Sequence, residues 1–203
     1  MSEPYIHTYR YRVSSNEADK IKNATYFAKY LRRRGWSLNA ICAAFGNWEV
    51  ETYLNPNYPQ YTSFPSNREG GFGMPHWTPW GAKIGDWAYN NYGLVPSATD
   101  DNPLGFFELQ IDFHEYNCKY GSEGGADWYN NGGYTYRWDE WKRSRDDVET
   151  LCRAYYYQYE RSGAGNPGDR PEKALWYWNY FQENPVYYIP LWLLFKFNRR
   201  WRT

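Results

Sequence analysis

The chain has 203 residues, which suits one domain, and 23 Lys and Arg residues balance 23 Asp and Glu residues, so that the formal net charge is zero. This balance argues against a bulk polyanion as a partner, and we expect no nucleic-acid binding. The N-terminal residues contain no apolar run like that of a signal peptide, and no stretch reaches the ~18 apolar residues of a membrane span. We therefore expect a protein that is made in a cytoplasm, without a signal peptide or a transmembrane segment.

Aromatic residues are unusually frequent: 23 Tyr, 12 Trp and 10 Phe make up 22% of the chain. Such rings build a core, but Tyr and Trp also present flat apolar faces with a polar edge, which sugars, bases and partner proteins all use. Most of these residues are therefore expected in the core, and some at a binding surface.

The first element expected is a helix that begins near Glu17. Ser14 and Glu17 have the spacing of a capping box, and Gly35 suits the end of the helix. Residues 1–15 before it show no clear pattern and are interpreted as a leader.

The stretch around which the chain is organised is a second helix, which Ser37 caps. Its apolar residues recur at three- and four-residue spacing and form one buried face: Leu38, Ile41, Cys42, Phe45 and Trp48. Glu51 continues this face, and the helix should end soon after it because Asn55 precedes a proline. The helix dipole and nearby rings should raise the pKa of Glu51, which makes it a candidate general acid. Glu49 is the rival, but it points to another face, and we expect it to be solvated.

The rest of the chain predicts four more helices separated by loops. In order, the sequence indicates a Pro-rich loop over 55–71, a shaped turn over 71–80, helices over 83–92 and 105–120, a Gly-rich excursion over 121–133, a short strand or wing over 134–138, and helices from 144 to about 160 and from 169 to 184. No repeat and no alternation of strands with helices is present. We expect a mainly α fold (α+β) of about six helices around a buried central helix, with a small β wing or loop lobe.

The domain expected from these elements covers residues 16–184, and a tail follows over 185–203. The tail is apolar and aromatic at first and basic at its end. It is interpreted either as a strand or turn packed on the domain, or as an anchor for another protein or a membrane surface.

Cysteines and histidines give little sign of a metal or a disulfide. Cys42, Cys118 and Cys152 are an odd number at wide spacing on expected helices, and we expect buried free thiols, with a disulfide pair as the less favoured alternative. His114 and Cys118 share a helix face, but nothing supplies two further ligands, so we expect a core pair. No metal and no cofactor are predicted.

Nucleophile and phosphate-binding motifs are absent as well, since the chain has no Gly-x-Ser-x-Gly, no cysteine in a reactive setting and no glycine loop before a helix. Carboxylate chemistry beside aromatic rings remains. That combination is typical of glycoside cleavage.

Three motifs resemble the phage tail lysozyme family. Residues 46–56 read Gly-Asn-Trp-Glu-Val-Glu-Thr-Tyr-Leu-Asn-Pro and resemble its signature Gly-Asn-x-x-x-Glu-Ser/Thr-x-x-Asn-Pro. Residues 71–79 resemble its second motif, Gly-x-Gly-x-x-Gln-Trp-Thr, and Tyr159-Glu160-Arg161 is similar to its third, an aromatic-Glu-Arg step. The likeness is to the lysozyme domain at the tail tip of short-tailed phages that infect Gram-positive bacteria.

The resemblance implies a lysozyme-like fold with a substrate cleft, peptidoglycan of a Gram-positive host as substrate, and Glu51 as the acid. The substrate-binding residues expected around it are Trp48, Tyr53, Phe72, His76, Trp77 and Tyr159. His76 stands where the family has glutamine; neutral imidazole also offers one donor and one acceptor, but it becomes charged below about pH 6.5. Glu69 is the candidate for a second catalytic carboxylate, and a plain surface residue is an equally supported interpretation. A single-glutamate mechanism stays open.

The function expected is cleavage of glycan strands by a muramidase carried in the virion, which opens the cell wall during genome delivery. A lytic transglycosylase, an endolysin and a non-catalytic tail or glycan-binding component are the alternatives. Other phage tail proteins are possible partners of the tail over 185–203.

Overall fold

The computed structural model describes residues 17–99, 102–121, 127–160 and 165–186. The leader expected over 1–15 lies outside these residues, and so does the tail from residue 187 onward. Both interpretations therefore stay predictions, as do the domain limits that depend on them.

Helices make up about half of the described chain. They are α1 (Glu17–Arg33), α2 (Leu38–Thr52), α3 (Asp86–Tyr92), α4 (Phe107–Tyr120), α5 (Trp138–Trp141), α6 (Val148–Tyr155) and α7 (Arg170–Glu183). Two short π-helical turns extend these helices: Gly81–Gly85 directly precedes α3, and Tyr156–Glu160 directly follows α6. A 3-10 turn, Pro103–Gly105, precedes α4. The prediction of a mainly α fold is confirmed. None of these described helices is both long and apolar enough to cross a membrane.

The strand expected over 134–138 does not form. Within the described part of this region the backbone makes one isolated antiparallel bridge, between Asn131 and Tyr134, and α5 already begins at Trp138. The rings of Trp138 and Trp141 are buried and stacked with centroids 5.6 Å apart. Their packing in the core overrides the alternating pattern that predicted a strand.

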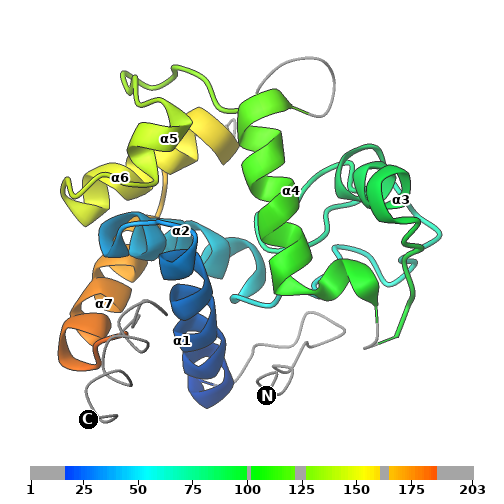
Figure 1. Ribbon diagram of the computed structural model, residues 1–203, viewed down its shortest axis with the longest axis horizontal. Helices are drawn as coiled ribbons and strands as arrows, with labels where there is room; N and C mark the ends of the chain where they lie inside the picture. Colours follow the sequence, from blue (N-terminus) through cyan, green and yellow to red (C-terminus); the bar gives the residue numbers. More distant parts are fainter. Residues whose placement is uncertain (1–16, 100–101, 122–126, 161–164, 187–203) are drawn as a thin grey trace, which may run out of the picture.

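Helix α2 is the central element, as predicted, and runs through the middle of the helices that surround it (Figure 1). The Ser37 hydroxyl accepts the N–H of Ala40 at 3.0 Å, and Tyr53 ends the helix in the left-handed region with φ 56°. The helix is buried on nearly every side, not on one face alone, because α1, α6 and α7 all pack against it.

Gly46 explains how closely α7 approaches α2. A Cβ at this position would lie only 2.8 Å from both the Cβ and the backbone nitrogen of Ala174, so any side chain would push the two helices apart. The close approach brings the first turn of α7 beside the last turns of α2.

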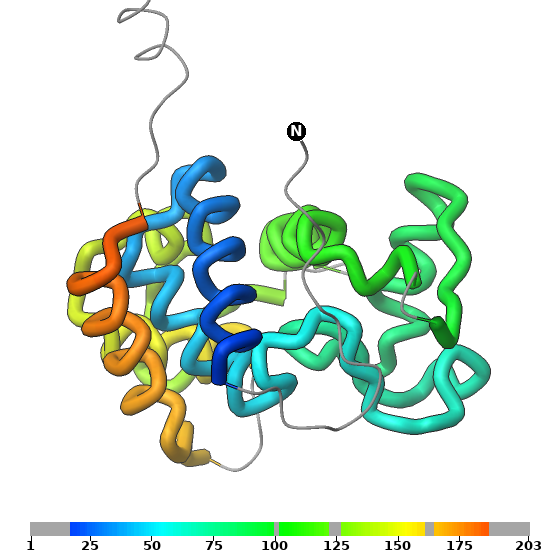
Figure 2. Tube along the Cα trace, turned by 90° about the horizontal axis from the view of Figure 1, so that it is seen from below, coloured from blue at the N-terminus to red at the C-terminus, as the bar shows by residue number. Residues whose placement is uncertain are grey.

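Two apolar clusters lie on either side of α4. The larger one fills the space among α1, α2, α6 and α7, which we call the helical group. The smaller one lies beside the irregular loop that connects α2 to α3, which we call the loop lobe, and it includes Phe72, Trp80 and Ile84. Figure 2 shows this lobe beside the helical group, and the loop lobe is the alternative to a β wing that the sequence left open.

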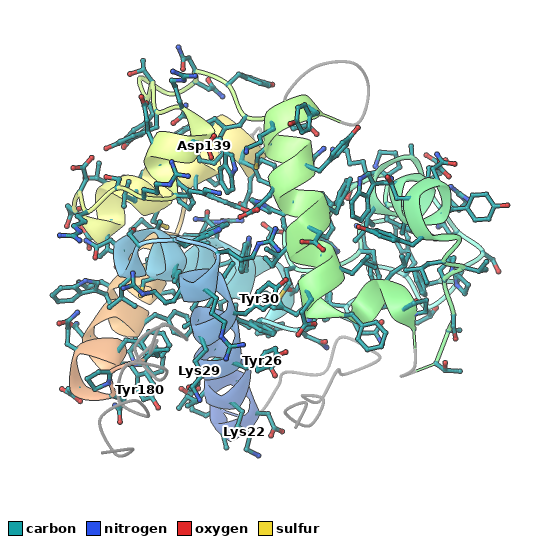
Figure 3. The ribbon with its side chains drawn as sticks, in the orientation of Figure 1. Lys22, Tyr26, Lys29, Tyr30, Asp139 and Tyr180 are labelled. Carbon is teal, nitrogen blue, oxygen red and sulfur yellow. The ribbon has the colours of Figure 1, made fainter. Side chains whose placement is uncertain are left out.

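The abundant aromatic residues mostly pack into these clusters and their edges. Tyr26 and Tyr30, for example, lie on the side of α1 that faces the start of α4 (Figure 3). The Tyr26 hydroxyl donates to Glu108, and the Tyr30 ring packs edge-on against Phe107 with centroids 5.7 Å apart.

Candidate active site

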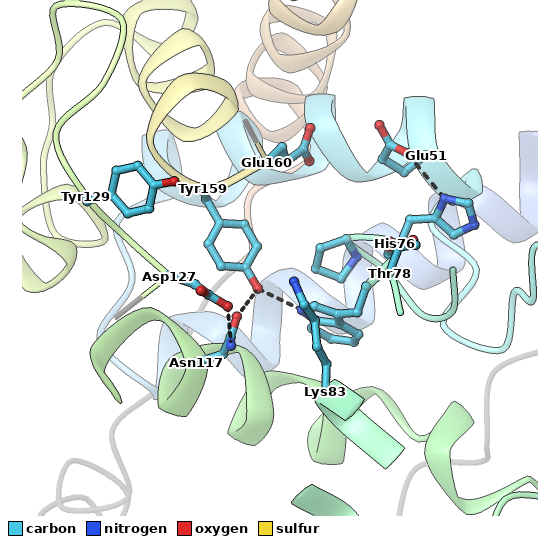
Figure 4. Close-up of a pocket in the computed structure, with 11 residues that line it drawn as sticks. Glu51, His76, Thr78, Lys83, Asn117, Asp127, Tyr129, Tyr159 and Glu160 are labelled. Carbon is cyan, nitrogen blue, oxygen red and sulfur yellow. Dashed lines mark hydrogen bonds and ion pairs between the residues drawn. The ribbon is translucent and has the colours of Figure 1, made fainter. Parts of the chain in front are cut away.

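A cavity of about 540 Å³ lies between the helical group and the loop lobe. Its walls come from the end of α2, the loop lobe, α4 and the π-helical turn after α6 (Figure 4). The lining residues are Glu51, Pro75, His76, Trp77, Thr78, Lys83, Asn117, Asp127, Tyr129, Tyr159 and Glu160. The volume is in the range of small-molecule sites, and two carboxyl groups in one cavity could carry out acid–base chemistry.

Glu51 lies in the last turn of α2, with its side chain 25% exposed. Its Oε1 accepts from Arg170 Nη2, and its Oε2 lies 3.6 Å from His76 Nδ1. Burial raises the pKa of this carboxyl, but the hydrogen bond and charge of His76 and those of Arg170 together outweigh it, so the pKa lies below its ordinary value. The expected raised pKa is wrong for the free protein, because His76 and Arg170, which is 119 positions away in the chain, stabilise the ionised form of Glu51.

Glu160 is a second carboxyl of the site, which the sequence analysis missed as a candidate. It ends the π-helical turn after α6, and its side chain is only 6% exposed. Burial, and then the negative charge of Glu51, raise its pKa to about 8 although Arg170 acts in the opposite direction. Glu160 is therefore protonated at neutral pH while Glu51 is ionised. Its position within the Tyr159-Glu160-Arg161 motif was the signal that could have identified it.

Arg170 connects the two carboxyls. It lies in the first turn of α7, and its Nε is 3.3 Å from Glu160 Oε2 while its Nη2 donates to Glu51. The guanidinium also lies over the Tyr156 ring at 5.0 Å and donates from Nη1 to the carbonyl of Pro167 at 3.2 Å. These contacts fix the guanidinium between the two acids.

His76 is held by a tight loop that the second motif forms. Phe72 and Trp77 pair through backbone hydrogen bonds of 3.1 and 3.0 Å, and the loop between them turns at His76, whose φ is 56°. A Cβ on Gly71 would lie 2.6 Å from His76 Nε2, so the imidazole packs directly over this glycine. A non-glycine residue at positive φ costs about 1–2 kcal/mol, and here that conformation turns the ring toward Glu51.

Trp77 and Tyr159 are the two predicted substrate-binding aromatic residues that line the cavity. Trp77 Nε1 donates to the Tyr159 hydroxyl at 2.7 Å, and that hydroxyl donates to Asn117 Oδ1 at 2.9 Å (Figure 4). These two hydrogen bonds hold both rings in place. Only 4% of Trp77 and 7% of Tyr159 are exposed.

The other three aromatic residues predicted to bind substrate lie elsewhere. Trp48 and Phe72 are fully buried and do not line the cavity; Trp48 Nε1 donates to Tyr155 inside the core, and Phe72 stacks on Phe64. Tyr53 is exposed at the end of α2 but is not part of the cavity wall. The aromatic spacing could not indicate which rings face the core.

The remaining glutamates are not part of the cavity either. Glu69 is exposed in the loop lobe and does not line the cavity, which matches the interpretation as a surface residue. Glu49 is buried, contrary to expectation, because Lys20 and Lys173 lie 3.3 and 3.2 Å from its Oε1. These ion pairs connect Glu49 of α2 to α1 and α7, on another side of α2 than the cavity.

His114 belongs to the core. Its Nε2 lies 2.6 Å from the Tyr155 hydroxyl and its Nδ1 3.5 Å from Cys118 Sγ, and burial lowers its pKa to about 3. The three cysteines are free and buried. Among the residues that the structure describes, no group of three or more His, Cys, Asp and Glu side chains is arranged to hold a metal ion.

Comparison with known proteins agrees with the three motifs. The sequence model of the family described as phage tail lysozyme matches residues 22–181. The chain is also 31% identical over 156 residues to Morphogenesis protein 1 of Bacillus phage B103. This match covers 77% of the chain but 38% of the relative, so the chain corresponds to less than half of that protein.

Proposed function

Because the chain belongs to the phage tail lysozyme family, we propose that it cleaves the glycan strands of peptidoglycan. The observation that supports this reaction best is the carboxyl pair in one cavity, of which Glu51 is ionised and Glu160 protonated at neutral pH. Two carboxyls with pKa values displaced in opposite directions are typical of glycosidases.

Glu51 is the proposed proton donor, since it is the more accessible of the two carboxyls and the resemblance assigns it this role. In its protonated form it gives its proton to the glycosidic oxygen between N-acetylmuramic acid and N-acetylglucosamine. The bond between that oxygen and the anomeric carbon breaks, and the cation-like sugar takes up either water or its own C6 hydroxyl. The attacking hydroxyl returns a proton to Glu51, which restores the site. Addition of water is hydrolysis, and addition of the C6 hydroxyl yields an anhydro sugar.

The walls of the cavity supply the binding contacts in this proposal. Trp77 and Tyr159 offer aromatic surface, Asn117 and Thr78 offer polar groups, and Lys83 adds a cation to a wall that also holds acids. His76 orients Glu51, because its Nδ1 is 3.6 Å from the carboxylate. A sugar ring with acetamido and hydroxyl groups suits this mixed lining.

Clearing of a suspension of Gram-positive cell walls tests the proposal. We expect the purified protein to clear it and Glu51→Gln to reduce the rate at least about 100-fold, because the proton donor is lost. Glu49→Gln is the matched control two positions away, since Glu49 lies outside the cavity. A Glu51→Gln protein as active as the wild type would disprove the assignment. Mass spectrometry of the fragments separates reducing ends from anhydro ends.

We further propose that the protein works from the virion during genome delivery, a role that its family and the morphogenesis protein support. Purified particles should then contain the chain, as mass spectrometry of washed virions can establish. An endolysin would instead accumulate in the lysate and be absent from particles. Wild-type protein that clears none of several wall types would favour a tail component that binds glycan without cleaving it.

A further inference from the structure

We propose that Glu160 is a positioning residue for the reaction proposed above: it takes over the Arg170 guanidinium, and so allows Glu51 to hold the proton that it donates. This inference depends on the proposed function, because it concerns the protonation of the same donor. It assigns a task to a buried carboxyl that the three motifs alone do not explain.

The first argument is the geometry of the three groups. They come from three different elements, with Glu51 at the end of α2, Glu160 at the end of the π-helical turn after α6, and Arg170 at the start of α7. One guanidinium contacts both carboxyls: its Nη2 donates to Glu51, and its Nε lies 3.3 Å from Glu160 Oε2. A single cation thus serves two acids.

The second argument is that the contact to Glu160 is incomplete. Within the described part of the chain, neither oxygen of Glu160 has a hydrogen-bond partner, and neither does Arg170 Nε. Buried polar groups without partners are rare in native proteins, and a catalytic role is one of the reasons for which they occur. Here the unused donor and the unused acceptors face one another at 3.3 Å, so a small rotation of the guanidinium pairs it with Glu160 in place of Glu51.

The third argument is conservation of charge. In the free protein one proton is on Glu160, Glu51 is ionised, and Arg170 pairs with Glu51. A sugar that covers the exposed quarter of the Glu51 side chain removes water from it and favours its neutral form. The proton then passes to Glu51, through cavity water, and Arg170 pairs with the new Glu160 carboxylate. The net charge of the three groups stays the same, which makes the exchange inexpensive inside the protein.

Other charged or titratable groups around the pair do not replace Glu160 in this role. His76 from the loop lobe contacts Glu51, Cys152 from α6 lies near Glu160, and Lys83 and Asp127 line the same cavity. Among the residues that the structure describes, Arg170 is the cation that contacts both carboxyls. The two acids therefore titrate as a coupled pair that shares one proton near neutral pH.

The pH profile of Glu160→Gln tests the inference, because glutamine keeps the shape of the side chain but cannot become an anion. Arg170 then has only Glu51 to pair with, so Glu51 stays ionised. We expect the alkaline limb of the kcat profile to move down by about one to two pH units, with activity at pH 7 reduced about 10- to 100-fold and largely restored at acid pH. Glu160→Asp should recover part of the wild-type profile.

A loss of activity by the same factor at every pH would overturn the inference, because a merely structural residue would act in that way. If Glu160→Gln does not fold, Glu160→Asp still tests the inference, because the shorter carboxyl pairs less well with Arg170 and should move the alkaline limb in the same direction by a smaller amount. An independent measurement is a 13C NMR titration of the Glu51 carboxyl with and without a bound chito-oligosaccharide. The pKa of Glu51 should rise on binding in the wild type but not in Glu160→Gln. Activity in Glu51→Gln would disprove the proposed function, whereas an unchanged Glu160→Gln profile would disprove this inference alone.

Discussion

The Glu51 carboxylate and the Arg170 guanidinium form an ion pair between residues 119 positions apart in the chain. The pair joins the last turn of α2 to the first turn of α7, and Glu160 meets the same guanidinium from a third element. We therefore expect both the stability of the fold and the proposed catalysis to depend on Arg170.

Replacement of Arg170 by Gln should lower the free energy of unfolding by about 2–3 kcal/mol, because it leaves Glu51 charged and partly buried without its cation. Urea denaturation at pH 7 measures this change. Arg68→Gln is the control, since the Arg68–Asp86 pair is about half exposed on both sides and should contribute less than about 1 kcal/mol. Equal effects of the two substitutions would contradict the prediction.

Gly71→Ala should displace the His76 ring and separate it from Glu51, because the new Cβ would lie 2.6 Å from His76 Nε2. We expect an activity loss of about tenfold and a destabilisation of about 1–3 kcal/mol. The control is the same substitution in a His76→Ala background, in which the ring is already gone. In that background the additional effect should nearly vanish, and two purely additive substitutions would disprove the contact.

Gly46→Ala should destabilise the protein by about 3 kcal/mol or more, since overpacking between two rigid helices cannot relax as a flexible side chain does. Its Cβ would lie 2.8 Å from the Ala174 Cβ. Thermal unfolding measures the loss, and Ala174→Gly in the same chain should restore only part of it, because the backbone of α7 remains in the way. Full restoration would show that the side chain alone sets the helix separation.

His114 should make the protein less stable in acid. Its pKa is about 3 in the folded chain and near 6.5 when unfolded, so the unfolded chain binds a proton that the folded chain does not. The stability is fully present above pH 6.5 and falls as the pH decreases toward 3, by about 2–3 kcal/mol between pH 7 and pH 4.5. Denaturant titrations over this range should show a shallower decline for His114→Gln than for the wild type.

Glu160 should act in the opposite direction. Its pKa is about 8 in the folded chain and near 4.5 when unfolded, so its contribution is fully present below pH 4.5 and is lost as the pH rises through 8. Glu160→Gln should remove this decline and gain about 1–3 kcal/mol relative to the wild type at pH 9. If the difference in free energy of unfolding between the wild type and the variant did not change between pH 5 and pH 9, the raised pKa would be contradicted.

Local patterns predicted the helices well because their signals lie close together in sequence. Ser37 caps α2, Asn55 before Pro56 marks its end, and Pro171 lies in the first turn of α7. The second motif likewise predicted a shaped turn, which brings His76 and Trp77 to the cavity.

What the sequence could not supply were facts that depend on the folded chain. The pKa of Glu51 was predicted from its own helix, but Arg170 determines its direction, and nothing near Glu51 in sequence indicates that arginine. Trp48 was placed in the cleft by its nearness to Glu51, although a helix that is buried on nearly every side turns it into the core. Glu160 belongs to the third motif, but only its burial beside another acid identifies its chemistry.

The three elements that meet at Arg170 also determine the order in which the site is assembled during synthesis. A nascent chain has synthesised both carboxyls by residue 160, but their cation follows only at residue 170, at the start of the last described helix. Until α7 docks on Gly46, the two acids lack their common partner and the cavity lacks its charge balance. The proposed site is therefore complete only after residue 170 has been made and α7 has packed against α2.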